Sequence, residues 1–374
     1  MKQVLNVYED CTGNQDISGS IDLVTDYFKN DCRDPEYDGD LTIANITWPS
    51  SPSIQGVSRT VPLGALQTIS GSLELTSIRV QDGQGSWKVD GGTLVEVSSN
   101  LTFSELEQFD MPNFQDLTTA GVLAFHNVTF GPDLVHIDEL WPKLWKVNTL
   151  DITNTSLTSF GPTSILLSPL DATFEAYVIA NANSRLTTLS VIGYGDNNPT
   201  VHVDIHNNNK YLSVDLPDIV TGLLNVDNVG DLHANALVNL GSPNDEFSVQ
   251  SISNNWFTKL TFPNLTTVHG EVEIDSNPLL SELDLGGLLS VTSLRITNNS
   301  ALRDIELPTL QAIGSSLYIE GPIDRCVASK PTLVILDSLM NSQIIRSDGK
   351  SRGRTGHYQV LGQAGLQDHK HHAS

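Results

Sequence analysis

The chain has 374 residues, of which 39% are apolar and 17% charged, so it can bury a sizeable core in one large domain or two ordinary ones. Its net charge of −24 argues against a nucleic-acid partner, because the main body has no stretch basic enough to neutralise phosphates. The sequence has no run of about 18 apolar residues, so no segment is expected to span a membrane.

Residues 1–38 are expected to form an N-terminal cap. The stretch SIDLVTDYFKN begins with Ser20, a residue type that favours helix N-caps. One face of this predicted helix carries three apolar residues, Ile21, Val24 and Phe28. Cys11 and Cys32 bracket the helix, and a disulfide between them would close a loop of about 20 residues and contribute roughly 3 kcal/mol. A reduced, buried pair is the alternative.

Residues 39–326 carry an internal repeat, which predicts a solenoid. Near-copies of one segment begin at Val203, Val272 and Leu294, and half of it recurs at Phe109. The shared pattern is apolar-x-apolar-x-x-Asn, followed by a second alternating stretch, often with Pro. The asparagine slot is filled by Asn208, Asn277 and Asn299.

The pattern resembles a leucine-rich repeat, but its second half favours strand over helix. LRDIELPTLQAIG alternates at Ile305 and Leu307 and meets Pro308, which disfavours a continuing helix. We therefore predict a mainly β protein, a right-handed parallel β-helix with coils of about 22–24 residues. The recurring asparagine is expected at a corner, where its amide can bond the neighbouring coil and form a ladder. An ordinary loop asparagine is the alternative.

Residues 327–374 are expected to form a C-terminal segment, partly disordered from about residue 346. From Arg346 onward the sequence has five Lys/Arg against two Asp/Glu, unlike the acidic body. The cluster of His369, His371 and His372 lies in this tail and is not predicted to be a metal site, which needs three or four fixed ligands. Cys326 follows the last clear repeat and has no evident partner.

Two groups of polar residues suggest chemistry but fit a scaffold better. His202, Asp204 and His206 alternate, so they share one face of a strand and could form a metal or acid–base row. Because Val201, Val203 and Ile205 supply the inward face, the polar trio is expected to face solvent. The carboxylates that could suggest a polysaccharide hydrolase have no convergent spacing: Asp215, Asp218, Asp227 and Asp231. We therefore predict no catalytic residue, no cofactor and no metal.

Aromatic residues raise the question of sugar binding, because aromatic rings stack on sugar faces. Trp141 and Trp145, in LWPKLW, lie four residues apart around a proline. They are candidates for glycan stacking, while packing inside a solenoid turn is the alternative.

The Cys11…Cys32 opening, followed by DGDLTIANI and coils of the type LRITNNSALRDIELPTLQAIGSSLYIEG, resembles fungal cell-surface proteins of the Ecm/Sps2-like family. Their fold is similar to the receptor L-domain. The resemblance implies a secreted, N-glycosylated, non-catalytic protein held at the plasma membrane or wall by a glycolipid anchor. It implies a role in wall organisation, with wall polysaccharide or surface proteins as partners.

Six sequons become candidate glycosylation sites through this resemblance: Asn45, Asn100, Asn127, Asn154, Asn264 and Asn298. Asn298 has the best physical case, since it lies beside the corner asparagine.

The ends of the sequence lack the family's targeting signals. The start, MKQVLNVYED, has no long apolar run, and the end, GQAGLQDHKHHAS, has no hydrophobic tail. Any lipid anchor is therefore not encoded here, and an intracellular protein or a piece of a longer one is expected. Three functions compete: a cell-wall-organising surface protein, an extracellular carbohydrate- or peptide-binding module, and a β-helical carbohydrate-active enzyme.

Overall fold

The computed structural model describes residues 11–32, 34–48, 59–80, 86–110, 114–131, 143–144, 146–160, 166–167, 176–190, 192–193, 201–216, 222–234, 237–241, 249–328 and 356–360. The chain divides into two compact units, Met1–Pro217 and Asp218–Ser374, called unit 1 and unit 2 below. Among the described residues, no helix is long and apolar enough to cross a membrane.

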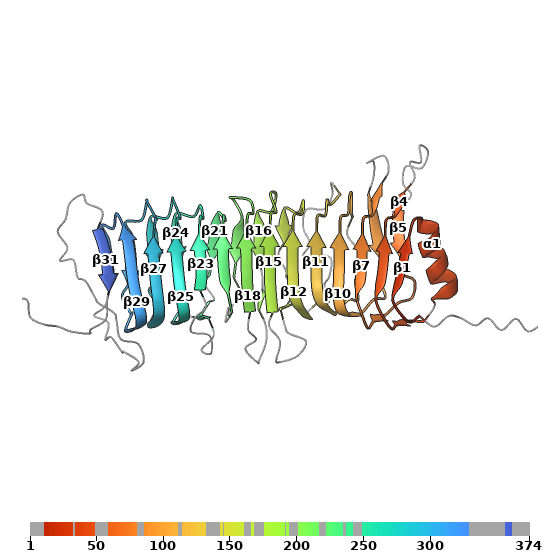
Figure 1. Cartoon of the computed structure of the whole chain (residues 1–374), viewed down its shortest axis with the longest axis horizontal. Helices are drawn as coiled ribbons and strands as arrows, with labels where there is room; N and C mark the ends of the chain where they lie inside the picture. Colours follow the sequence, from red (N-terminus) through yellow and green to blue (C-terminus); the bar gives the residue numbers. More distant parts are fainter. Residues whose placement is uncertain are drawn as a thin grey trace, which may run out of the picture. The chain divides into compact units, whose positions relative to one another are not determined.

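Unit 1 is a stack of parallel β coils (Figure 1). One strand of each coil adds to a long sheet, and each strand pairs in parallel with the same strand of the next coil. These strands are β1 (Gln15–Ser18), β3 (Leu41–Ala44), β7 (Leu73–Thr76), β10 (Glu96–Ser104), β11 (Thr119–His126), β12 (Lys146–Thr153), β15 (Ala176–Asn181) and β18 (Val201–His206).

Unit 2 repeats this arrangement with two sheets. Its long-sheet strands are β20 (Leu224–Asp227), β23 (Val249–Ser253), β25 (Thr267–Asp275), β27 (Ser290–Thr297) and β29 (Ala312–Gly321). A second parallel sheet holds β24 (Lys259–Thr261), β26 (Glu282–Asp284), β28 (Asp304–Leu307) and β30 (Arg325–Ala328). The predicted mainly β, parallel solenoid is confirmed.

Shorter strands complete the coils. In unit 1 they are β2 (Glu36–Tyr37), β4 (Thr47–Trp48), β5 (Arg59–Pro62), β6 (Thr68–Ile69), β8 (Arg79–Val80), β9 (Trp87–Asp90), β13 (Ser159–Phe160), β14 (Leu166–Leu167), β16 (Thr188–Ser190), β17 (Ile192–Gly193) and β19 (Ser213–Asp215). In unit 2 they are β21 (Asp231–His233) and β22 (Asn239–Leu240).

The core of each unit consists of columns of apolar side chains that repeat from coil to coil. In unit 2, Ile274, Ile296 and Ile319 are paired in register and buried. In unit 1, Phe103 pairs with Phe125, and their rings stack with centroids 5.1 Å apart. Strand alternation sends these residues inward, and each buried side chain of this size stabilises the fold by about 1.5–3 kcal/mol.

The spacing between coils differs from the prediction in part of the chain. Glu273 pairs with Arg295, 22 residues on, as predicted. Thr42 instead pairs with Glu74, 32 residues on, because the N-terminal coils carry longer connections. Parallel pairing fixes the strand register and leaves loop length free, so the repeat period varies without breaking the sheet.

The N-terminal cap consists of a short helix, α1 (Ile21–Asp26), that continues as a π-helical turn, η1 (Tyr27–Asp31), beside β1 (Figure 1). Val24 and Phe28 are buried, which agrees with the predicted apolar face. Ser20 stands at the N-cap position, as predicted, with extended backbone, although its side chain makes no capping hydrogen bond. The helix is held by packing instead.

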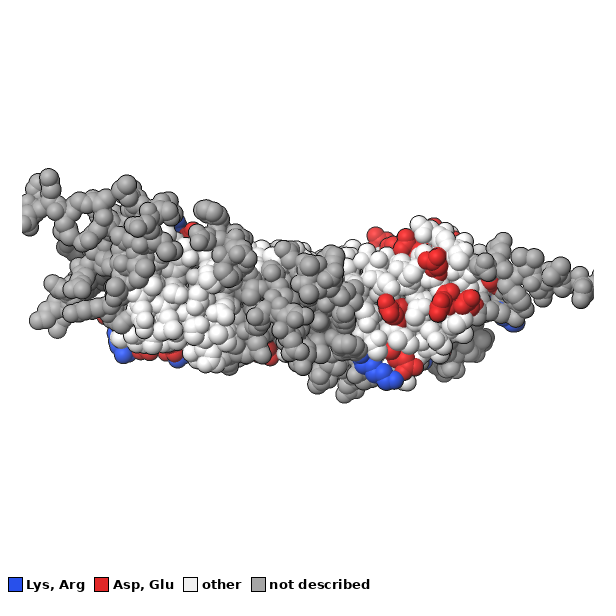
Figure 2. Space-filling view, turned by 90° about the horizontal axis from the view of Figure 1, so that it is seen from below, with Lys and Arg blue, Asp and Glu red and all other residues white. Residues whose placement is uncertain are grey.

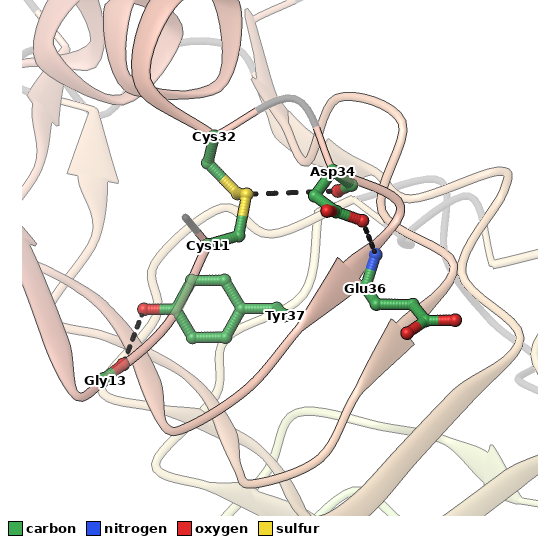
Figure 3. The surroundings of a disulfide bond; sticks show 6 residues. All are labelled: Cys11, Gly13, Cys32, Asp34, Glu36 and Tyr37. Atoms are coloured by element: carbon green, nitrogen blue, oxygen red, sulfur yellow. Dashed lines mark hydrogen bonds between the residues drawn. A yellow bond between two sulfur atoms is a disulfide. The ribbon is translucent and has the colours of Figure 1, made fainter. Parts of the chain in front are cut away.

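A disulfide joins Cys11 to Cys32 and ties the end of the cap to the strand entering the first coil (Figure 3). Beneath it, the buried ring of Tyr37 directs its hydroxyl to the carbonyl oxygen of Gly13, 2.9 Å away. Burial raises the pKa of that hydroxyl. Asp34 accepts a hydrogen bond from the backbone N–H of Glu36 at 3.1 Å, which shapes the turn after the disulfide.

The C-terminal segment contributes one described strand, β31 (Gly356–Val360), which pairs antiparallel with β29. In unit 2 this strand covers the edge of the long sheet and runs in the opposite direction to the other strands (Figure 1). Cys326, in β30, is exposed and is not bonded to another cysteine.

Candidate functional site

Each coil turns its corner through a residue with left-handed backbone. Eleven such residues recur, one residue before the asparagine slot or its equivalent: Asn45, Ser77, Glu105, Asn127, Asn154, Ala182, Asn207, Asn228, Asn254, Ser276 and Asn298. Asparagine is common here because its short polar side chain tolerates this conformation better than most residues do. The corner therefore has the same geometry throughout the described coils.

In unit 2 the residue after the corner forms a buried asparagine ladder. The side-chain oxygen of Asn277 accepts a hydrogen bond from the backbone N–H of Asn255 at 2.9 Å. Asn299 accepts from the backbone N–H of Asn277 at 3.0 Å. The amide nitrogen of each also donates backward, from Asn277 to the carbonyl of Ile252 and from Asn299 to that of Ile274. The ladder thus satisfies buried backbone groups.

Unit 1 contains a shorter version of the ladder. Asn208 accepts from the backbone N–H of Asn183 at 3.0 Å and donates to the carbonyl of Ala180 at 2.8 Å. Asn183 in turn accepts from the backbone N–H and the hydroxyl of Thr155. The prediction for Asn208, Asn277 and Asn299 agrees with these bonds, and the ladder also includes Asn183 and Asn255, which were not predicted. In earlier coils the slot holds buried apolar residues: Ile46, Ile78, Leu106 and Val128.

The outer face of the long sheet in unit 1 carries rows of polar side chains across neighbouring strands. Asp16, Thr42, Glu74 and Thr102 are register partners on β1, β3, β7 and β10. Each alternates along its strand with buried apolar residues, so strand geometry turns it outward. A second row lies two residues before the first row in the sequence and includes Asp40, Ser72 and Asn100.

These rows line a groove of about 380 Å³ on unit 1. The groove holds carboxylate, amide and hydroxyl groups, and no lysine or arginine lines it. Asp40 is fixed within it, because its carboxylate accepts the backbone N–H of Ser72 at 2.8 Å. Within the described part of the chain, the carboxylates of Asp16 and Glu74 make no hydrogen bond or ion pair. On the surface turned to the viewer in Figure 2, acidic side chains gather over the N-terminal coils.

Further along the same face, histidines pair with aspartates. The Nε2 of His126 lies 2.9 Å from Asp151, and Asp151 also accepts the hydroxyl of Thr153 at 2.7 Å. The hydrogen bond to Asp151 raises the pKa of His126 above its usual value, although partial burial opposes this. The pair links β11 to β12 on the outer surface.

The alternating trio of β18 lies on this outer face, as the sequence indicated. The ring of His202 stacks on Tyr177 with centroids 4.6 Å apart, and His206 lies 3.3 Å from Asp204. Among the described residues no group of three or more histidine, cysteine or acidic side chains could hold a metal ion. The arrangement offers hydrogen bonding and ring stacking rather than a ligand set.

Other predicted residues do not converge on one place. Asp227 is half-buried at the end of β20, and Asp231 is exposed beside His233. Trp87 is buried and Trp256 is exposed, with its indole N–H donating to Asn228. Several candidates lie outside the described residues: Asp218, Trp141, Trp145, His369, His371 and His372.

The sequon asparagines fall into two structural groups. Four of them occupy exposed left-handed corners: Asn45, Asn127, Asn154 and Asn298. Asn100 is exposed in β10 and lines the groove, and Asn264 is exposed in the turn after β24. All six side chains are therefore at the surface.

Fold and site together define a parallel β-solenoid protein with internal asparagine ladders and a polar outer face. The chain is 32% identical over 130 residues to "Sporulation-specific protein 2" of Saccharomyces cerevisiae. The matched region covers 34% of this chain and 24% of that protein, so it spans about a quarter of the curated relative. No protein-family model matches the chain. No solved structure matches it either.

Proposed function

We propose that the chain is a non-catalytic protein of the fungal cell surface that contributes to the organisation and integrity of the cell wall. The observation that carries the proposal is the 130-residue similarity to a yeast sporulation-specific protein, because sporulation requires a fungus to build new wall. The fold supports it, since a solenoid presents a long, pre-organised face to an extended partner. Wall polysaccharide or other surface proteins are the partners that suit this face.

The proposal includes entry into the secretory route and attachment to the plasma membrane or wall through a lipid anchor. The disulfide between Cys11 and Cys32 supports this route, because disulfides persist in oxidising compartments. The exposed sequons at corner positions, Asn298 among them, are accessible to a glycan.

The test is deletion of the gene in its source fungus, followed by exposure to wall-binding dyes and wall-lytic enzymes. We expect the deletion strain to be more sensitive than its parent, and a tagged full-length copy to be found at the cell surface. Rescue by an Arg295→Asn copy but not by an Ile296→Asn copy would tie the role to the folded solenoid. Unchanged sensitivity, or a tagged protein found only in the cytosol, would contradict the proposal.

A further inference from the structure

The groove on β1, β3, β7 and β10 has the composition of a sugar-binding surface. Carboxylates accept hydrogen bonds, while amides and hydroxyls both donate and accept, so the set complements the hydroxyl groups of a carbohydrate. Most of the lining residues belong to four register-paired strands, and Asn14, Asp40 and Ser72 each lie just before one of them, so the lining is held in place before any ligand arrives. A pre-organised site loses little conformational freedom on binding.

The spacing of the row favours a polymer over a single sugar. Asp16, Thr42, Glu74 and Thr102 follow one another at the strand separation of about 4.8 Å, which is close to the advance of one pyranose ring along an extended chain. A polysaccharide that crosses the strands therefore meets a carboxylate at every second strand and a hydroxyl between.

Two solvent-accessible carboxylates of the groove are open to a ligand. Asp16 and Glu74 have no hydrogen-bond or ionic partner within the described residues, whereas Asp40 is occupied by a backbone N–H. Sugar hydroxyl groups would take the place of the water that hydrates these two carboxylates. Hydrogen bonds to a charged acceptor are among the stronger ones.

Charge limits the class of ligand. The groove has no lysine or arginine, and the whole chain carries a net charge of −24, so a polyanion would be repelled. Most of the lining groups are neutral amides and hydroxyls, which suit hydroxyl groups better than ammonium groups. We infer that the groove binds an extended, uncharged polysaccharide across the strands β1 to β10. This inference deepens the proposed function. It rests on that proposal for the cell surface as the place where the protein would meet such a polymer.

The test uses the full chain produced without N-glycans, because Asn100 belongs to a sequon and its own glycan would compete for the groove. Three insoluble probes are compared in sedimentation assays at low and high salt: an uncharged β-glucan, an acetylated amino-sugar polymer and its deacetylated, cationic form. We expect retention on at least one uncharged probe, with affinity little changed by salt, since the ligand carries no charge whose attraction salt could screen.

Two variants locate the site. Glu74→Gln keeps the size of the side chain and should weaken retention roughly tenfold, and Thr42→Tyr should abolish it by filling the groove. The matched control is Glu271→Gln, which changes an outer-face glutamate of unit 2 that likewise has no partner among the described residues and should leave retention unchanged. Thermal unfolding verifies that each variant is folded.

Three outcomes would overturn the inference: no retention on either uncharged probe, retention only on the cationic polymer that disappears in high salt, or Glu74→Gln and Thr42→Tyr proteins that both bind like the wild type. Because the binding assay uses purified protein, a negative binding result does not contradict the proposed function. In the same way, the absence of a deletion phenotype does not contradict the binding result.

Discussion

The side-chain oxygen of Asn299 accepts two hydrogen bonds from Asn277, one from its backbone N–H at 3.0 Å and one from its side-chain amide at 3.1 Å. Both residues are almost fully buried. One side chain therefore fixes the corner of the preceding coil and leaves no polar group of that corner unsatisfied. Together with the backbone bond from Ser276 to Thr297 and the side-chain bond from Asn298 to Asp275, the ladder holds successive turns of unit 2 in register on this side.

Replacing a central member should be costly. Asn277→Ala removes the acceptor for the backbone N–H of Asn255 and the donor to the carbonyl of Ile252. We expect the free energy of unfolding to fall by about 2–3 kcal/mol, because a buried, unsatisfied polar group costs about 1–3 kcal/mol. Chemical denaturation measures this, with Glu271→Ala as a control on the outer face that should change stability by no more than about 0.5 kcal/mol. Equal effects of the two changes would show that the ladder contributes little.

The two faces of β27 should respond very differently to the same substitution. Ile296 is fully buried, so Ile296→Asn loses its burial and places an amide in the core, at a cost of several kcal/mol. Arg295 is exposed and lies 3.2 Å from Glu273, so Arg295→Asn should cost no more than about 1 kcal/mol.

Hydrogen exchange would show where the damage from Ile296→Asn falls. We expect faster exchange in β25, β27 and β29, with the cap around Cys11 and Cys32 unchanged, because coils in a solenoid couple mainly to their neighbours. Uniformly faster exchange along the chain would instead mean that the protein unfolds as one cooperative unit.

The disulfide can be tested by counting thiols. The chain has three cysteines, so unfolded, unreduced protein should show one free thiol, that of Cys326. Three free thiols would refute the bridge. Cys11→Ser should lower stability by roughly 2–4 kcal/mol, since the bridge restrains the unfolded chain. Cys326→Ser is the matched control and should leave stability nearly unchanged.

The His126–Asp151 pair should make a small part of the stability depend on pH. The pKa of His126 is raised in the folded state by its hydrogen bond to Asp151. The contribution is therefore fully present below the usual histidine value of about 6.5 and is lost as pH rises through the folded pKa. Because the pair is partly exposed, we expect no more than about 1 kcal/mol.

A nuclear magnetic resonance titration of the His126 ring checks this directly. The folded protein should titrate above about 6.5, and Asp151→Asn should bring the pKa back toward that value. A ring that titrates at or below the usual value in the unchanged protein would contradict the assignment.

The repeat in unit 2 could be predicted from the sequence because each position of a coil needs the same kind of side chain in every copy. Ile274 and Ile296 are 22 residues apart and are register partners, and Asn277 and Asn299 keep the same interval. Asn183 and Asn255 were harder to recognise because the small Ala180 stands where other copies have isoleucine, because Gln250 replaces the first apolar residue before Asn255, and because Thr155 fills the slot with a hydroxyl. Hydrogen bonding to the next coil tolerates such changes, whereas a sequence pattern does not.

The groove could not be predicted in the same way. Asp16, Thr42 and Glu74 are separated by intervals of 26 and 32 residues, so no fixed period connects them, and only the register of β1, β3 and β7 brings them together. Positions on the outer face also do not require a particular side chain, so their residues show no pattern beyond alternation. Ser20 occupies the N-cap position that its residue type predicts, but the sequence could not show that its side chain makes no capping hydrogen bond.

The equal intervals between Asn255, Asn277 and Asn299 have a consequence for how such a chain can change through evolution. Removal of residues 277–298 would join the coil of Asn255 directly to the coil of Asn299. The asparagine ladder, the columns of apolar side chains and the left-handed corner would all match across the junction. Unequal recombination between repeats can therefore lengthen or shorten the protein by whole turns while every new interface reuses an old one. Selection can therefore change the length of the protein one coil at a time, while the packing of the core stays the same.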